Sequence, residues 1–457
     1  MFHRHGNGYW RLRKENLMAL LAQEAVGNKT QRFKKLWRTY LLDERFLYDC
    51  FQMLKDAAPG VDGVVIKDYD VNLLANIKKL ANNLSTWSYR PTNVKRVWIP
   101  KKGGKLRPLG IPTVEDKIVQ MACKRVLEAI YEGSFNPISY GFRPKRSCHM
   151  ALHQVSWDLN RENVSTVVDM DIEKCFDSID HKMLLKVIEV RVDDKDLIRL
   201  LVRMLRTGSM DGSKYTPAGT IGTPQGSVLS PLLANIYLHY IIDVWFMKEF
   251  KAKQKKYGFC SIVRYADDFV ACFEHPAIAS LFVNQLKHRL SLSLLKVAKD
   301  KCRMVSMGKR VDAQRRNHRG NSFNFLGFTF YNTKTRSGAY TARLKTSKDN
   351  MSSKLKAMST YIKKARSTLP IKEWWKVVVA KVKGHIQYFG VSGNFRQISA
   401  YVYWTKEIAF KYANRRSQKR SYNWEQFNRF VEFNPLPTPT IKYNLWENPC
   451  AKLNLAS

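Results

Sequence analysis

Two acidic segments carry the side chains best suited to chemistry in this chain of 457 residues. Asp267 and Asp268 lie between apolar flanks, a pattern that predicts a β-hairpin with both carboxylates at its tight turn. Upstream, the apolar run 167–172 predicts a short strand that carries Asp169 and Asp171. If the two strands meet, three carboxylates form a site for two hard cations such as Mg²⁺, which keeps room for water and substrate phosphate.

An adjacent acidic pair on a turn is more commonly a solvated loop or a cap. Here aromatic and β-branched residues surround Asp267 and Asp268. Because buried like charges are costly without a neutralising cation, these surroundings favour a metal site. Two-metal phosphoryl transfer is the chemistry that such a carboxylate cluster would support.

The charge balance predicts a polyanionic partner. Lys and Arg number 78 against 38 Asp and Glu, for a net charge of +40, and 45% of the residues are hydrophobic. Such a basic, aromatic-rich chain is typical of nucleic-acid-binding proteins. A basic ribosome-associated or membrane-surface protein is the alternative, but such a protein would have no use for a carboxylate metal cluster.

The cysteines and histidines indicate no zinc site. The eight cysteines are scattered with no C-x-x-C pair, which fits unpaired thiols in a reducing cytosol. His149 and His153 have zinc-helix spacing, but Met150 replaces the glutamate of that motif and no third ligand is evident. The chain has no apolar signal core and no run of 18 apolar residues, so we expect no membrane partner and a cytoplasmic protein.

Hydrophobic periodicity predicts a mixture of helices and short strands. Residues 94–111 predict a β-hairpin with a basic tip, and 323–330 alternate as strands do. Helices are expected at 73–84, 116–132, from about 147, 175–179, 195–206, 229–240, 277–292, and twice within 351–389.

Four segments together resemble the reverse transcriptases encoded by bacterial group II introns and their relatives without an intron. In chain order they are KLRPLGIPT at 105–113, DMDIEKCFDSIDH at 169–181, GTPQGSVLSPLLANI at 222–236 and YADD at 265–268. Each is moderately specific, but their order and spacing make the set very specific. The resemblance covers about residues 30–400 and implies an α+β right-hand polymerase, with a small antiparallel palm sheet, fingers and a helical thumb.

The resemblance implies roles for individual residues. Asp171, Asp267 and Asp268 would be the catalytic ligands of two Mg²⁺ ions, with Mn²⁺ as a substitute and Asp169 as the alternative to Asp171. Phe176, five positions after Asp171, would exclude a ribose 2′-OH, although a packed core aromatic is the alternative.

The remaining implied contacts surround the nucleotide and the primer. Gln225 would line the nucleotide pocket, and Arg107 with Lys105 or Lys101 would bind the triphosphate. Lys301 would lie beside the leaving pyrophosphate. Leu326 and Gly327 would support the primer 3′ end, with Gly327 allowing close approach of the backbone.

The expected organisation is an N-terminal helical extension (1–65), fingers (66–165), palm with finger insertions (166–335), helical thumb (336–410) and basic tail (411–457). The expected activity is RNA-directed DNA polymerisation in a bacterial cytoplasm, with RNA template, DNA primer, dNTPs and a structured intron or non-coding RNA as partners. An endonuclease with paired cysteines is not expected. The alternatives are a domesticated enzyme of phage defence or DNA repair, and a maturase that binds RNA without polymerase activity. The oligomeric state is left open.

Overall fold

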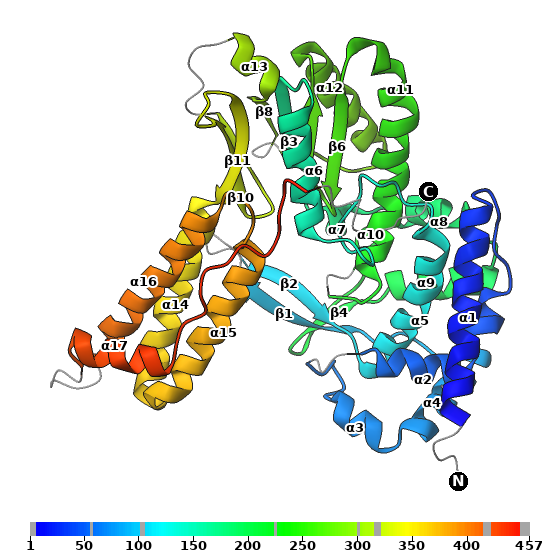
Figure 1. Cartoon of the computed structure of the whole chain (residues 1–457). Helices are drawn as coiled ribbons and strands as arrows, with labels where there is room; N and C mark the ends of the chain where they lie inside the picture. Colours follow the sequence, from blue (N-terminus) through cyan, green and yellow to red (C-terminus); the bar gives the residue numbers. More distant parts are fainter. Residues whose placement is uncertain are drawn as a thin grey trace.

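The computed structural model describes residues 6–54, 58–100, 106–223, 226–298, 302–314, 321–414 and 422–447, and the side chains of 6–16 and 312–314 lie outside that description. Its mixture of helices and small sheets makes the chain an α+β protein (Figure 1). The N-terminal part is mostly helical. Its elements are α1 (Gly6–Gly27), η1 (Trp37–Leu41), α2 (Glu44–Gln52), α3 (Ile66–Val71), α4 (Leu73–Ser85), β1 (Val94–Pro100), β2 (Leu106–Ile111), α5 (Val114–Tyr131) and α6 (Cys148–Arg161).

The middle of the chain contains the sheet that holds the acidic segments. Its strands β6, β7, β3 and β8 lie in that order, and each neighbouring pair is antiparallel. The elements are β3 (Thr166–Asp171), α7 (Cys175–Ser178), α8 (His181–Glu189), α9 (Lys195–Leu205), β4 (Ser209–Asp211), β5 (Lys214–Thr216), α10 (Ser230–Leu238), η2 (His239–Asp243), η3 (Phe246–Phe250), α11 (Lys251–Gln254), η4 (Lys255–Tyr257), β6 (Cys260–Tyr265), β7 (Asp268–Phe273), α12 (Pro276–Leu292), β8 (Arg303–Ser306) and α13 (Lys309–Gln314).

Within its described residues, the C-terminal part contains a three-stranded sheet and four helices. The helices stand to one side of the central sheet in Figure 1, and the chain then returns toward α6. The elements are β9 (Ser322–Phe325), β10 (Phe328–Lys334), β11 (Tyr340–Thr346), α14 (Lys348–Thr368), α15 (Ile371–Phe389), α16 (Phe395–Ala413) and α17 (Trp424–Phe433).

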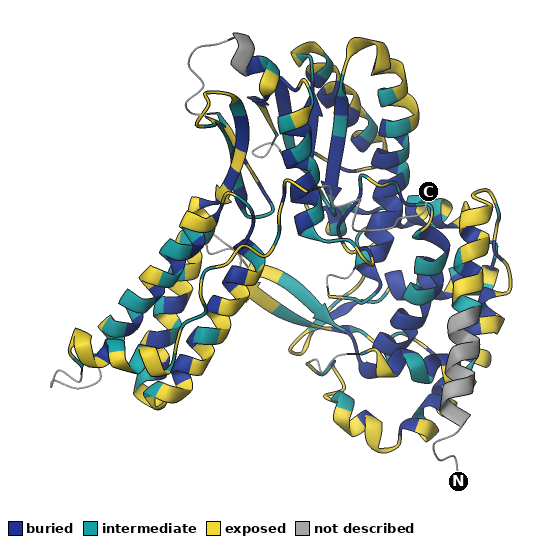
Figure 2. Ribbon diagram, in the orientation of Figure 1, coloured by how far each residue is buried: buried dark blue, intermediate teal, exposed yellow. Residues whose placement is uncertain are grey.

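Both faces of the central sheet are buried, because its side chains alternate between two hydrophobic cores. Val168 and Met170 belong to the core that includes α5, α10 and α12, whereas Val167 and Val270 belong to the core that includes α6 and β9–β11. A third core lies within α14–α17. Figure 2 shows the burial concentrated in the central sheet and its helices, while the visible outer faces of the C-terminal helices are largely exposed. Two-sided burial fixes the strand register, because a slip by one residue would exchange the faces.

Side-chain caps begin several of the helices that flank the candidate site. Thr113, Ser147, Asp180 and Ser347 each accept a hydrogen bond from a backbone N–H in the first turn of the following helix. A cap of this kind stabilises a helix by about 1 kcal/mol. No helix among the described residues has the length and apolar character needed to cross a bilayer.

Candidate active site

The YADD segment forms the tight hairpin that its sequence predicts. β6 and β7 pair up to Tyr265 and Asp268, and only Ala266 and Asp267 connect them. Ala266 has φ 59°. Left-handed backbone is unusual for a residue with a Cβ and costs about 1 kcal/mol. The surroundings must therefore hold the turn that presents the two carboxylates.

The upstream acidic strand lies directly beside this hairpin. β3 pairs antiparallel with β7, and the last residue pair of that ladder is Asp171 opposite Asp268. Directly opposed residues in antiparallel strands have Cβ atoms about 4.5–5.5 Å apart, on the same face. Asp169 lies two residues earlier and faces Val270. The structure thus brings Asp171, rather than Asp169, to the end of the sheet where the turn lies.

The buried thiol of Cys175 lies close enough to Asp171 and Asp267 for both charges to affect its pKa. Burial raises the pKa of Cys175, and the negative charges of Asp267, Asp171 and Asp177 raise it further against the opposing effect of Arg264. Asp171 ends β3 and Asp267 lies in the turn between β6 and β7, yet the charges of both raise the pKa of the same thiol. The three acids of the candidate site, Asp171, Asp267 and Asp268, are each partly exposed to solvent.

The donor set suits a hard divalent cation. Carboxylate oxygens are the ligands that Mg²⁺ prefers, and one or two of them commonly suffice because water and substrate phosphates complete the octahedron. Among the described residues, no three His, Cys, Asp or Glu side chains already form a metal cage. The three carboxylates are therefore of the right chemical type to act as partial ligands of Mg²⁺, whose remaining ligands would come from water and substrate.

Hydrogen bonds attach the start of the 222–236 segment to the residues that follow β3. The N–H and the hydroxyl of Thr223 donate to the Phe176 carbonyl at 2.7 and 3.3 Å. The N–H of Gly222 donates to the Ile179 carbonyl at 2.8 Å, and the Gly222 carbonyl lies 2.6 Å from His181 Nε2. Phe176 is half-buried and packs against the core. A half-buried ring agrees with both expectations, because one side packs in the core while the exposed part could meet a sugar.

The same segment touches β2. A Cβ added at Gly226, whose φ is +107°, would lie 2.4 Å from the Gly110 carbonyl oxygen, so the two backbones are in close contact. A cavity of about 220 Å³ beside this contact is lined by residues that include Arg96, Asp177 and Thr223. Arg107 lies exposed on β2. Lys101, Lys105 and Gln225 lie outside the described residues.

The hairpin at 326–327 is confirmed as a hairpin, and its turn is tied to the C-terminal helices. Leu326 and Gly327 have φ of 47° and 84°. The Leu326 carbonyl accepts from the Tyr388 hydroxyl at 2.9 Å, and the Gly327 carbonyl accepts from Asn350 Nδ2 at 3.0 Å. The turn conformation alone explains the glycine. Lys301 and the basic run 415–420 lie outside the described residues.

The histidine pair makes structural contacts. His149 Nε2 lies 2.8 Å from the Tyr388 carbonyl, and its ring stacks on Tyr443 with centroids 3.7 Å apart. His153 stacks on Trp157. The seven described cysteines are free thiols.

Sequence reasoning missed the groups behind the turn. Arg264 is fully buried and bonds to Asp243, Asn235 and the Ala266 carbonyl. The backbone of Gly141 also lies against the turn. A signal was present, because Arg264 and Asp243 are single charges within apolar runs, and buried charges require partners.

Comparison with known proteins agrees with the geometry. A family profile described as reverse transcriptase (RNA-dependent DNA polymerase) matches residues 99–330, about half of the chain. The group II intron-encoded protein LtrA of Lactococcus lactis subsp. cremoris is 37% identical over 225 residues, which are 49% of this chain and 37% of LtrA. The chain therefore matches well under half of LtrA.

Two further relatives extend the comparison. Protein YkfC of Escherichia coli K12 is 32% identical over 314 residues, which cover 61% of this chain and 77% of YkfC. The putative COX1/OXI3 intron 2 protein of Saccharomyces cerevisiae is 34% identical over 215 residues, covering 46% of this chain and 25% of that protein. The family profile matches about half of this chain, and the two acidic segments of the chain lie on paired strands. The chain therefore belongs to the reverse transcriptase (RNA-dependent DNA polymerase) family.

Proposed function

We propose that this protein is an RNA-directed DNA polymerase that extends a primer 3′ end with dNTPs on an RNA template. The observation that supports this best is the register that sets Asp171 opposite Asp268 beside the turn with Asp267. The four family segments also contact one another in space. The first segment (β2) contacts Gly226 of the third, Thr223 of the third bonds to Phe176 of the second, and the second (β3) pairs with β7, which begins at the end of the fourth.

Asp171, Asp267 and Asp268 would hold two Mg²⁺ ions, for which Mn²⁺ could substitute. The bound pair would stabilise the charge on the attacking and leaving oxygens of an in-line displacement. The protein's own contribution is to hold the three carboxylates at the end of one rigid sheet.

The neighbouring residues would select and position the nucleotide. Phe176 would lie beneath the sugar and exclude a 2′-OH, while Arg107, Lys105 and Lys101 would bind the triphosphate and Gln225 would line the pocket. A cavity of about 220 Å³ supports this proposal, because its lining includes Pro108 and Asp177, the residues that follow Arg107 and Phe176 in the chain. Lys301 would face the pyrophosphate, and the Leu326–Gly327 turn would support the primer end.

The right-hand layout follows from the same assignment. The fingers would span about 66–165, the palm 166–335 around the central sheet, and the thumb 336–410, after the N-terminal extension 1–65 and before the tail 411–457. Helix α16 continues to Ala413, so the helical thumb would run slightly past its expected limit. The tail adds α17 and a bridge from Tyr443 to Val391.

Primer extension on poly(rA)/oligo(dT) with Mg²⁺ tests the proposal. The wild type should extend the primer, and the double variant Asp267→Ala, Asp268→Ala should not. The exposed Asp70→Asn serves as a control for loss of a carboxylate elsewhere. Full activity in the double variant would refute the site, and an inactive wild type would refute the polymerase assignment.

We also propose that the protein binds a structured intron RNA as a splicing maturase. Lys354, Lys356, Lys363 and Lys364 are exposed on α14, and two of the relatives are named as intron proteins. Phosphate contacts from these exposed lysines would supply affinity. Tight binding of a folded intron RNA without any primer extension would indicate a maturase that lacks polymerase activity.

A further inference from the structure

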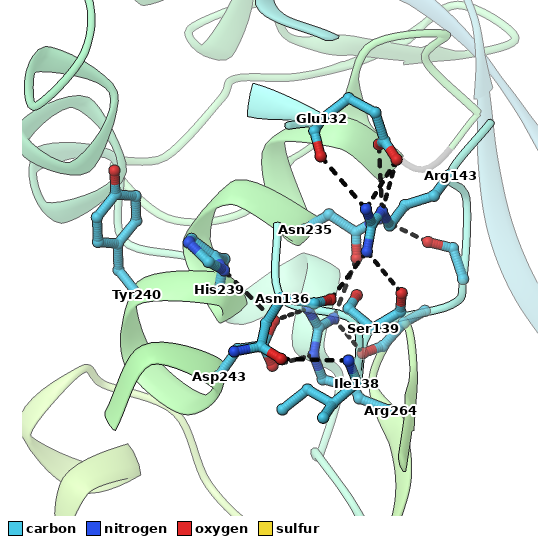
Figure 3. Close-up of polar contacts among 12 residues, drawn as sticks. Glu132, Asn136, Ile138, Ser139, Arg143, Asn235, His239, Tyr240, Asp243 and Arg264 are labelled. Carbon is cyan, nitrogen blue, oxygen red and sulfur yellow. Dashed lines mark hydrogen bonds and ion pairs between the residues drawn. The ribbon is translucent and has the colours of Figure 1, made fainter. Parts of the chain in front are cut away.

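A fully buried ion pair lies directly behind the acidic turn. Arg264, near the end of β6, donates from Nε to Asp243 Oδ1 at 2.7 Å and from Nη2 to Asp243 Oδ2 at 2.5 Å. Neither side chain is exposed to solvent. Figure 3 shows the two groups facing each other, with His239 beside Asp243. This bidentate geometry fixes the plane of the guanidinium group.

The third nitrogen of the guanidinium reaches the turn itself. Arg264 Nη1 donates to Asn235 Oδ1 at 3.0 Å and to the Ala266 carbonyl at 2.9 Å. Ala266 is the left-handed residue immediately before Asp267. The side chain of Arg264 therefore holds the carbonyl of the left-handed residue that immediately precedes Asp267.

Asn235 links the same guanidinium to a second backbone segment. Its Nδ2 donates to the Gly141 carbonyl at 2.7 Å. Backbone bonds join the two segments as well, from Tyr140 N to the Arg264 carbonyl at 2.9 Å and from Arg264 N to the Ile138 carbonyl at 2.8 Å. The turn is thus supported on two sides, by a charged side chain and by a neighbouring loop.

A second arginine fixes that loop. Arg143 donates to both carboxylate oxygens of Glu132, and its Nη1 donates to the carbonyls of Asn136 and Ser139 at 2.9 and 2.8 Å (Figure 3). The loop that borders the turn is therefore itself rigidly anchored.

The ion pair needs an explanation other than stability. Removing two charges from water is costly, and well-packed apolar residues often serve a core as well or better. Burial acts to raise the pKa of Asp243, but the Arg264 guanidinium and His239 hold that pKa below its ordinary value, so the carboxylate stays ionised. What apolar residues could not supply is a directional bond to the Ala266 carbonyl.

We propose that Arg264 is a positioning residue, whose guanidinium, fixed by Asp243 and Asn235, holds the Ala266 carbonyl and so sets the direction of Asp267 and Asp268. This inference rests on the proposed polymerase function. It predicts that loss of the guanidinium disturbs metal binding and chemistry more than it disturbs nucleotide affinity.

The test compares variants that keep the core filled. Arg264→Met with Asp243→Leu removes both charges together, because removing Arg264 alone would leave an unpaired buried carboxylate. Arg264→Lys is the second variant, since a single ammonium cannot reproduce the three-nitrogen geometry. The matched control is Arg191→Met, because Arg191 is equally buried but bonds to Ser134 and to the carbonyls of Ala25, Asn28 and Gln31, far from the turn in sequence.

The readouts are kcat, the KM for dNTP and the Mg²⁺ concentration that gives half-maximal primer extension. A displacement of about 1 Å in a catalytic group can lower the rate about 100-fold. We therefore expect kcat to fall about 10–100-fold in both Arg264 variants. KM for dNTP should change little, and the Mg²⁺ requirement should rise, because Mg²⁺ demands near-ideal geometry.

The control and the contrary outcomes separate positioning from stability. Arg191→Met should lower the melting temperature without changing the Mg²⁺ requirement. A folded Arg264 variant with wild-type kcat and a wild-type Mg²⁺ requirement would overturn the inference. The inference would also fail if the Arg191 control changed kcat and the Mg²⁺ requirement as much as the Arg264 variants do. If the double variant does not fold, Arg264→Lys alone decides by the same criteria.

Hydrogen exchange keeps the inference testable apart from activity. In the Arg264 variants, amides of residues 265–268 should exchange faster than in the wild type while the remaining central sheet keeps its protection. Unchanged exchange at the turn would refute the positioning role even in an inactive protein. Conversely, if the wild type extends no primer but the turn loosens as expected, the polymerase proposal fails and the structural role of Arg264 stands.

Discussion

Replacing Gly141 by alanine should displace the acidic turn by a distance that the structure defines. A Cβ at this position would lie 2.5 Å from the Ala266 nitrogen and 3.0 Å from the Tyr265 carbonyl carbon, whereas ordinary contacts begin at 3.4 Å. Both obstructing atoms belong to backbone, so no flexible side chain can move aside. The φ of Gly141 is not in the left-handed range, so the effect of alanine would be steric rather than conformational.

Relief of this contact requires a movement of roughly 1 Å, either of the turn or of the 138–141 loop. The loop is anchored by Arg143, so we expect the turn to move. Overpacking of this kind typically destabilises a fold by about 1–3 kcal/mol. Misplacement of a catalytic group by 1 Å can lower the rate about 100-fold, so activity should fall much further than the fraction of folded protein.

The assay is steady-state primer extension at a temperature well below the melting transition of Gly141→Ala, with thermal unfolding measured on the same sample. Gly27→Ala is the matched control, because a Cβ there would meet nothing within 4 Å. That control should retain wild-type kcat. Wild-type kcat in Gly141→Ala, or a loss that the unfolded fraction explains entirely, would refute the reasoning.

Three further outcomes are expected. Phe176→Val should relax discrimination against rNTPs, measured as the ratio of kcat/KM for dNTP and rNTP, and an unchanged ratio would remove Phe176 from the sugar site. Burial raises the pKa of Asp158 from 3.8 to about 6. The folded state therefore holds this proton more tightly than the unfolded state does, so the contribution of Asp158 to stability should fall by about 2 kcal/mol as pH rises from 4 to 7. Asp158→Asn, which can keep the bonds to Gln154 and Ser261, should show a smaller loss in thermal unfolding, and an identical pH dependence would contradict this origin. Affinity for an RNA–DNA duplex should fall steeply between low and moderate salt, and a salt-independent Kd in a titration would contradict phosphate contacts.

The chemistry-bearing elements were predictable because their signals are local. The apolar flanks of the Asp267 hairpin, the alternation of residues 167–172 and the glycines of the 222–226 segment each specify a short element. The structure confirms the hairpins β1–β2 and β6–β7, and places the expected helices within a few residues of their predicted limits. The pairing of Asp171 with Asp268, by contrast, depends on which strands become neighbours, and family resemblance rather than periodicity supplied it.

The elements that were missed depend on distant partners. The short β4–β5 pair owes its place to a parallel contact of Val94 with Ser209. Tyr443 pairs with Val391 across a long sequence separation. The role of Arg264 could not be predicted for the same reason, since Asp243 and Asn235 lie in a separate helical region. A charge in an apolar strand indicates that a partner exists without showing which residue it is.

Iron-mediated cleavage would test the central claim most directly, because it locates a bound divalent ion without requiring catalysis. Fe²⁺ in place of Mg²⁺, with ascorbate and peroxide, cuts the backbone near the ion. We predict cuts near both residue 171 and residues 267–268, suppressed by excess Mg²⁺ and absent in the Asp267→Asn, Asp268→Asn variant. Cuts at only one of these segments, or at neither, would contradict a shared metal site at the end of the central sheet.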